Sequence, residues 1–242
     1  MEFICLAAGK GSRMGRLGTY LQKAMYPVGL KPFLQHSLEQ LLASGVAPAG
    51  SRIVLVVGHL AHQVEAYFGD RFEGLEVAYV RQERLAGTGD ALRLAATALH
   101  DGGSVVAWQG DLFVTSQLFA QLVRHPQANV VTLGEGHEDE SPVLRATTVG
   151  DEVSRVWQGA GPLLDVGLWK LGAGLLPEFG EVAAPGGEYR MLPNLQRLIE
   201  RGVRVGFVTS SEWVHLGGTL PSAEENVRRV ARRLWREGPA RT

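Results

Sequence analysis

The first 34 residues hold glycines and cations whose spacing suits the binding of phosphate. A short apolar run, Phe3–Ala8, leads directly into a turn that contains Gly9 and Gly11. The cations after this turn include Arg13, Lys23 and Lys31. Glycines directly after a strand let backbone N–H groups approach a phosphate and point a helix N-terminus at it, and nearby cations neutralise its charge. These residues therefore predict a nucleotide-binding site.

Two common glycine-rich motifs do not fit this stretch. A P-loop needs Gly, four residues and then Gly-Lys-Ser/Thr, whereas the residues after Gly9 read KGSRM. A dinucleotide fingerprint has a third Gly or Ala where Met14 stands, and an acid after the second strand, which here ends in Gly58 and His59. An ordinary strand-to-helix turn would explain the glycines but not the cations.

Two further stretches place polar groups just after apolar runs. Gln82 carries an amide that can donate and accept, as the recognition of a base edge requires, and Gly87 and Thr88 follow it at the start of a helical pattern. A plain helix N-terminus capped by Thr88 is the simpler alternative. Asp111 follows the run Val105–Trp108 after Gln109 and Gly110, which places a carboxylate at the end of a strand, where it could simply cap a turn.

The composition fits a single α/β domain. The chain has 242 residues, of which 45% are hydrophobic, enough for a large core. Its formal net charge of −1 gives no overall attraction to nucleic acid or to an anionic membrane. The one cysteine, Cys5, cannot form an internal disulfide, and no apolar run reads as a signal peptide or membrane span. We therefore expect a cytoplasmic protein with no membrane or nucleic-acid partner.

Strand-like runs alternate with helical patterns along the first half of the chain. The predicted strands are Phe3–Ala8, Ile53–Val57, Leu75–Val80, Val105–Trp108 and Val130–Leu133. The predicted helices are Phe33–Ser44, Ala61–Phe68, Gly89–Leu99 and Gln117–Arg124, with a further amphipathic helix over Glu224–Trp235. This alternation predicts right-handed crossovers and a parallel sheet with both faces covered. Ligands of such sheets bind beyond the carboxyl ends of the strands.

The N-terminal stretch resembles the signature of sugar-1-phosphate nucleotidylyltransferases, LAAGxGxRM…PK…PVxxKPxL. The matching positions are Leu6–Met14, Lys23, Pro27, Val28, Lys31 and Pro32, and Gln22 stands where the family has proline. The resemblance implies the nucleotide-diphospho-sugar transferase-like α/β fold, a Rossmann-like, mostly parallel mixed sheet flanked by helices. It implies that Arg13 binds the leaving pyrophosphate and that Lys23 holds the acceptor and α-phosphates. The turn residues expected to bind the nucleotide are Ala7, Ala8, Gly9 and Gly11.

Later segments extend this resemblance. The segment from Gln82 to Leu92 is similar to the family's Q…GTAxAL element, which implies base contacts from Gln82, Gly87 and Thr88. A family Gly-Asp pair implies that Asp111 holds Mg²⁺. The residues implied for the phosphorylated acceptor are Lys31 at the edge of the site, Asp165 in an NxGxY-like strand, and Glu188 in a GEYxLTD-like helix start.

Three departures from the family pattern concern the acceptor and the metal. Trp157–Gly159 stands where the family has Glu-Lys-Pro, and Leu112 replaces a common Asn. His215 replaces the second metal-binding Asp, although imidazole suits softer ions better than Mg²⁺. Asp111 and phosphates could hold Mg²⁺ alone, Mn²⁺ or another divalent ion could replace it, or catalysis could be impaired.

The implied activity is transfer of a nucleotidyl group from an NTP to a sugar 1-phosphate or similar phosphorylated acceptor, with release of pyrophosphate. The alternatives are a phosphocholine-type cytidylyltransferase of the same fold, a catalytically impaired nucleotide-binding homologue and, more distantly, an NAD-dependent oxidoreductase. We expect one domain over residues 1–238, with a nucleotide-binding half (1–133), an acceptor-binding half (134–220) and a C-terminal helix (222–237). Residues 239–242 form a tail, and the C-terminal helix could pack on the domain or on a second subunit.

Overall fold

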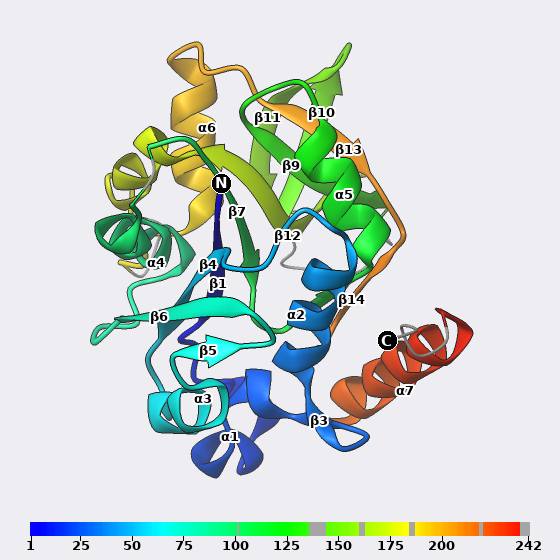
Figure 1. Ribbon diagram of the computed structural model, residues 1–242. Coiled ribbons are helices and arrows are strands. Elements are labelled where there is room, and N and C mark those ends of the chain that lie inside the picture. Colours follow the sequence, from blue (N-terminus) through cyan, green and yellow to red (C-terminus); the bar gives the residue numbers. More distant parts are fainter. Residues whose placement is uncertain (101, 136–143, 160–162, 184–186, 218–219, 238–242) are drawn as a thin grey trace.

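The computed structural model describes residues 1–100, 102–135, 144–159, 163–183, 187–217 and 220–237. Its centre is one ten-stranded mixed sheet with the order β10-β11-β13-β9-β12-β7-β1-β4-β6-β5 (Figure 1). The expected tail, residues 239–242, lies outside the described residues. Within the described ranges, no helix combines the length and the apolar character that crossing a membrane requires.

Four parallel strands form the half of the sheet that carries the predicted nucleotide site. They are β1 (Glu2–Ala7), β4 (Arg52–Val57), β6 (Leu75–Arg81) and β7 (Ser104–Gln109). In β1, Cys5 lies opposite Leu55 of β4 and Trp108 of β7, and all three side chains are fully buried. Burial on both faces explains the continuous apolar runs in the sequence. A short strand, β5 (Arg71–Phe72), pairs antiparallel with β6 at the edge.

The other half of the sheet contains antiparallel pairs. Its strands are β9 (Val130–Glu135), β10 (Leu144–Val149), β11 (Glu152–Gln158), β12 (Leu163–Gly172) and β13 (Gly206–Thr209). Because β12 runs antiparallel to both β7 and β9, β9 has the same direction as the four parallel strands. The parallel arrangement expected from the alternating pattern therefore holds for all five predicted strands. It does not extend to β10–β12, which follow one another without helical crossovers and so pair antiparallel.

Helices cover both faces of the sheet through two apolar clusters. One face packs against α2 (Phe33–Ala43), α3 (Ala61–Phe68) and α5 (Ser116–Arg124). The other packs against α4 (Thr88–Ala95), the 3-10 helix η4 (Ala173–Gly180) and α6 (Met191–Glu200). The helix expected over Gly89–Leu99 is too long, because α4 ends at Ala95 and tightens into the 3-10 turn η3 (Ala96–Ala98). The other predicted helices of the first half are confirmed to within a residue.

A third, smaller cluster joins the segment that follows β1 to the C-terminal helix. The elements around it are the short helices η1 (Ser12–Met14), α1 (Leu17–Tyr20) and η2 (Lys23–Met25), the hairpin β2 (Pro27–Val28) and β3 (Lys31–Pro32), and the pair β8 (Leu112–Val114) and β14 (Trp213–His215). The C-terminal helix α7 (Leu220–Glu237) buries Ala223 and Val230 against Phe113 and Val214. Its apolar face therefore packs on this same chain.

Candidate active site

A cavity of about 470 Å³ lies beyond the carboxyl ends of β1, β6 and β7. Its lining comes from the glycine-rich turn (6–14), residues 22–24, Gln82, Leu85, Gly87, Thr88, Ala91, residues 109–111 and Glu188. A larger depression of about 780 Å³ between α2, α5 and β13 contains none of the predicted site residues. The smaller cavity therefore collects most of the side chains that the sequence singled out.

The glycine-rich turn presents unpaired backbone donors to this cavity. Gly11 has φ = 60°, a left-handed conformation that glycine adopts without strain, and η1 starts directly after it. In the described part of the chain, nothing accepts a hydrogen bond from the backbone N–H groups of Gly9, Lys10 or Gly11. Arg13 lies on η1 and also lines the cavity. Several N–H groups and a guanidinium together suit a polyphosphate.

Gln22 anchors the segment that carries Lys23 to the end of β1. Its side-chain Nε2 donates to the Ala7 carbonyl at 2.6 Å, and its Oε1 accepts a hydrogen bond from the Ala24 N–H. The backbone N–H of Gln22 donates to Gln63 Oε1 at 2.8 Å. These contacts fix the backbone by hydrogen bonds at the position where the family pattern has proline.

Lys23 and Asp111 form an ion pair on the cavity wall. Lys23 Nζ donates to Asp111 Oδ2, and the two side chains are 13% and 24% exposed. Burial by itself would raise the pKa of the Asp111 carboxyl, but Lys23, His215 and hydrogen bonds lower it to about 2. Asp111 is therefore a carboxylate over the whole physiological range.

His215 is held beside Asp111 by the small sheet of β8 and β14. In this sheet His215 pairs with Leu112, and the Leu216 N–H donates to the Asp111 carbonyl at 2.8 Å. Leu112 is fully buried here, which explains an apolar residue where the family pattern has a polar one. The interpretation that His215 occupies the position of a second metal-binding residue is consistent with this placement.

The hydrogen bond of His215 fixes its tautomer. Its Nε2 lies 2.9 Å from the Val166 carbonyl, which only accepts, so Nε2 carries the proton and Nδ1 keeps a lone pair. Burial lowers the pKa of His215, Asp111 raises it, and Lys23 and Arg13 lower it, with a net shift below the ordinary value. The ring is therefore neutral at pH 7 and can act as a metal ligand.

The three residues expected to bind the acceptor lie in different surroundings. Glu188 lines the cavity and pairs with Arg190 at 3.1 Å. Lys31 lies on β3 outside the cavity lining and pairs with Glu39 of α2 at 2.7 Å. The structure therefore brings Glu188, but not Lys31, to the predicted nucleotide site.

Asp165 is engaged inside the sheet instead of facing the cavity. Its Oδ1 accepts from Trp169 Nε1 at 2.8 Å and from the Gly167 N–H at 3.3 Å, across an irregularity in the pairing of β12 with β9. Burial raises the pKa of Asp165 to about 7, against these two hydrogen bonds. Asp165 does not belong to the cavity lining.

Two lining or supporting residues were not predicted from the sequence. Gln109, the last residue of β7, lines the cavity next to the expected Gly-Asp pair. Asp90, on the first turn of α4, is buried and accepts a hydrogen bond from Gln82 at 2.8 Å. The only sequence signal for Asp90 is that it is a polar residue on the inward face of a helix. This signal can be recognised only once the register of α4 is known.

The fold and the family follow from comparison with known proteins. A structure of UDP-glucose pyrophosphorylase complexed with UDP-glucose superimposes with a TM-score of 0.81 at 17% identity, over 96% of this chain and 99% of that one. This match confirms the expected fold class.

Curated relatives match shorter stretches. The bifunctional protein GlmU of Paracidovorax citrulli is 37% identical over 115 residues, 48% of this chain and 23% of its own length. The D-glycero-alpha-D-manno-heptose 1-phosphate guanylyltransferase of Aneurinibacillus thermoaerophilus is 30% identical over 125 residues, 52% of each chain. The chain thus spans about a quarter to a half of the length of these relatives. The model of the MobA-like NTP transferase domain matches residues 3–174, which include the glycine-rich turn and Asp111, so the chain belongs to the family of MobA-like NTP transferase domains.

Proposed function

We propose that the chain transfers a nucleotidyl group from a nucleoside triphosphate to a phosphorylated small molecule and releases pyrophosphate. The observation that carries this proposal is the convergence of four features in one cavity: free turn N–H groups, Arg13, Lys23 and Asp111. Together they supply donors and positive charge for phosphates and a carboxylate for a cation. Family membership supports the same reaction class.

The reaction requires attack by an acceptor phosphate oxygen on the α-phosphorus, in line with the leaving pyrophosphate. Because the phosphate groups repel one another, catalysis depends mainly on positioning and on charge neutralisation. We assign the turn residues Ala7–Gly11 to the triphosphate, Arg13 to the leaving pyrophosphate, and Lys23 to the α-phosphate and the acceptor. Gln82, Gly87 and Thr88 are assigned to the base, since all three line the same cavity.

A divalent cation would be held by Asp111 and His215. Among the described residues, no group of three or more His, Cys, Asp or Glu side chains forms a complete metal cage. A catalytic Mg²⁺ does not need one, since it commonly binds one or two carboxylates together with substrate phosphates and water. The neutral His215, with Nε2 bonded to a carbonyl, fits a metal ligand that accepts Mn²⁺ better than Mg²⁺. When bound, the cation would neutralise charge on the α-phosphate.

A sugar 1-phosphate is the acceptor we propose. The heptose 1-phosphate guanylyltransferase is named for such an acceptor, and it is 30% identical over 52% of this chain. Of Lys31, Asp165 and Glu188, the three residues expected to bind the acceptor, only Glu188 lines the cavity, and its carboxylate can accept hydrogen bonds from hydroxyl groups. Asp165 and other residues of the range 134–220 would supply further contacts, together with Lys31 from the N-terminal segment, after rearrangement on binding.

A panel of NTPs crossed with phosphorylated acceptors, followed by pyrophosphate release, tests this function. Release that needs both an NTP and a sugar 1-phosphate supports it. Release only with CTP and phosphocholine would favour the cytidylyltransferase alternative. Tight NTP binding in calorimetry without release for any acceptor would instead identify a nucleotide-binding homologue that has lost the reaction.

A further inference from the structure

The loop that leads into α4 is hydrogen-bonded to the segment that leads into α6. The Tyr189 N–H donates to the Ala86 carbonyl at 2.5 Å, and the Tyr189 carbonyl accepts from the Gly89 N–H at 2.6 Å. The Met191 N–H donates to Thr88 Oγ1 at 3.0 Å. We call these hydrogen bonds the clip. The clip joins two segments that lie about a hundred residues apart in the chain.

Two glycines let the backbones approach this closely. A Cβ atom at Gly87 would lie 2.6 Å from the Tyr189 carbonyl oxygen. One at Gly89 would collide with the carbonyl oxygens of Phe179 and Tyr189. Gly89 lies within α4 and has no positive φ, so lack of space alone requires glycine there. A methyl group at this position would therefore push Tyr189 away from the loop.

Both sides of the clip reach the cavity. Gly87 and Thr88 line it from the loop. Glu188, the residue before Tyr189, lines it from the other segment. The Thr88 hydroxyl does not cap α4, whose N-cap is Gly87 and has no side-chain hydrogen bond; it bonds to the start of α6 instead. The cavity lining on each side therefore belongs to the clip or lies next to it in the chain.

Buried contacts behind the clip hold α4 and α6 against each other. Leu92 of α4 belongs to the same apolar cluster as Met191 and Leu192 of α6, and both helices cover the same face of the sheet (Figure 1). Asn194 is fully buried and donates from Nδ2 to the Arg190 carbonyl at 2.8 Å, which fixes the entry into α6. A shift of the loop therefore moves the start of α6 with it.

We propose that the clip couples the two substrate sites, so that a nucleotide bound against Gly87 and Thr88 fixes Glu188 for the acceptor. The proposal rests on the nucleotidyl-transfer function above. Tyr189 is the positioning residue, because its backbone holds Glu188 to the loop and it does not line the cavity. A nucleotide that orders the loop must order Glu188 as well, since the clip has to break before the two can separate. Linkage makes the effect mutual, so the acceptor tightens nucleotide binding by the same factor.

Hydrogen–deuterium exchange of the wild-type protein is the first test. ATP, CTP, GTP and UTP are added in turn with Mg²⁺, and any nucleotide that slows exchange in residues 86–92 should also slow it by roughly fivefold or more in residues 187–192. Protection of residues 86–92 alone would overturn the coupling and leave the proposed function intact. Protection of both segments without pyrophosphate release for any acceptor would support the coupling and refute the proposed reaction. Protection of neither segment by any nucleotide would overturn both.

The variant Gly89→Ala tests whether the clip transmits the effect. The added methyl group would push Tyr189 from the loop, and Gly89 itself lies outside the cavity lining. A nucleotide should still protect residues 86–92, whereas its protection of residues 187–192 should fall roughly fivefold. In turnover, KM for the sugar 1-phosphate at saturating NTP should rise roughly tenfold. Undiminished protection of residues 187–192 would show that the nucleotide reaches Glu188 directly, and would overturn the proposal.

Gly174→Ala is the matched control for this variant. It adds the same methyl group in η4, where a Cβ atom would meet no other part of the described structure within 4 Å. Exchange and KM should therefore both match the wild type. Changes as large as those of Gly89→Ala would trace the effect to a general loosening of the fold, and the proposal would fail.

A second pair of variants separates the clip from side-chain packing. Met191→Pro and Met191→Ala both remove a buried side chain, but only proline also removes the N–H that donates to Thr88. Met191 is the first residue of α6, a position that suits proline. Nucleotide protection of residues 187–190 should be roughly threefold weaker in the proline variant than in the alanine variant. Equal protection would overturn the proposal, and this pair decides the matter if Gly89→Ala does not fold.

Discussion

Lys23 and Asp111 neutralise each other on the cavity wall, with Lys23 Nζ donating to Asp111 Oδ2. Lys23 comes from η2, after the glycine-rich turn, whereas Asp111 follows β7, so the pair joins two segments far apart in the chain. We assign Lys23 to phosphate and Asp111 to the cation. The ion pair keeps both charges satisfied in a partly buried site. In the proposed reaction, phosphate would replace Asp111 as the partner of Lys23, and the cation would replace Lys23 as the partner of Asp111.

We expect Asp111→Asn to lower metal-dependent pyrophosphate release by at least about a hundredfold. The amide retains the shape of the carboxylate but has no net charge to attract a divalent ion. NTP affinity in the presence of EDTA should change much less. Without metal, the substitution removes only the carboxylate that competes with phosphate for Lys23. Turnover measured against metal concentration checks this prediction. Unchanged metal dependence would place the cation on other residues.

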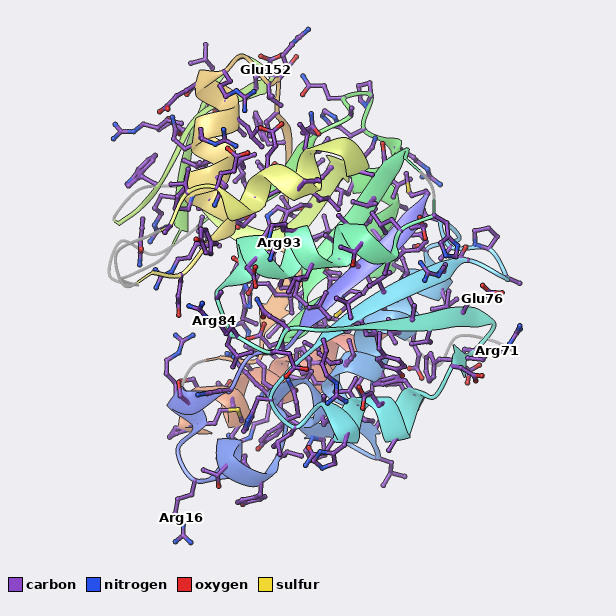
Figure 2. All side chains as sticks on the ribbon, turned by 90° about the vertical axis from the view of Figure 1, so that its left-hand side faces the viewer. Arg16, Arg71, Glu76, Arg84, Arg93 and Glu152 are labelled. Atoms are coloured by element: carbon purple, nitrogen blue, oxygen red, sulfur yellow. The ribbon has the colours of Figure 1, made fainter. Side chains whose placement is uncertain are left out.

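Arg13→Ala should lower kcat/KM for the NTP by at least about tenfold. Arg13 lines the cavity, and we assign its guanidinium to the pyrophosphate, where water is a poor replacement. Arg16→Ala is the matched control, since Arg16 is exposed and extends away from the molecule in Figure 2. The control removes the same charge three residues away, so it reports the general electrostatic contribution. Equal losses in the two variants would show that Arg13 has no specific contact.

The nucleotide half of the fold could be predicted because its signals are local. Buried strands such as β1 appear as short apolar runs, and Gly11 marks a turn that needs a left-handed residue. The strands β8 and β14 could not be predicted in this way. Each has three residues, and the two are about a hundred positions apart, so only the tertiary fold pairs His215 with Leu112.

The candidate site was predictable where the backbone places a side chain directly at a strand end. Asp111 and Gln82 follow β7 and β6 and line the cavity. Lys31 and Asp165 show the limit of this reasoning, since each finds a partner that sequence spacing does not reveal. Glu39 holds Lys31 from a neighbouring helix, and an irregular strand turns Asp165 toward the indole of Trp169.

His215→Asp should raise Mg²⁺-supported turnover and lower the ratio of Mn²⁺-supported to Mg²⁺-supported activity. A second carboxylate beside Asp111 suits a hard cation better than an imidazole does. The new carboxylate would lose the hydrogen bond to the Val166 carbonyl, so a loss of thermal stability should accompany the gain. His62→Asp, at an exposed position of α3, controls for added negative charge. Loss of activity with both metals would show that the imidazole has a positive role of its own.

Asp165→Asn should stabilise the protein at pH 8 and have little effect at pH 4. The folded-state pKa of Asp165 is about 7, above the value of about 3.9 expected in the unfolded chain. Between these values the folded state binds more protons, so wild-type stability falls as the pH rises from 4 through 7. The difference between the folded and unfolded pKa values sets an upper bound of about 4 kcal/mol on the gain in stability. We expect a measured gain of roughly half this bound, because the structure relaxes around the charged carboxylate. The side-chain oxygen of asparagine can still accept the hydrogen bond from Trp169, and the amide has no charge to bury. Urea unfolding of both proteins at pH 4, 6 and 8 measures the effect, and a pH-independent difference would show that Asp165 does not titrate as proposed.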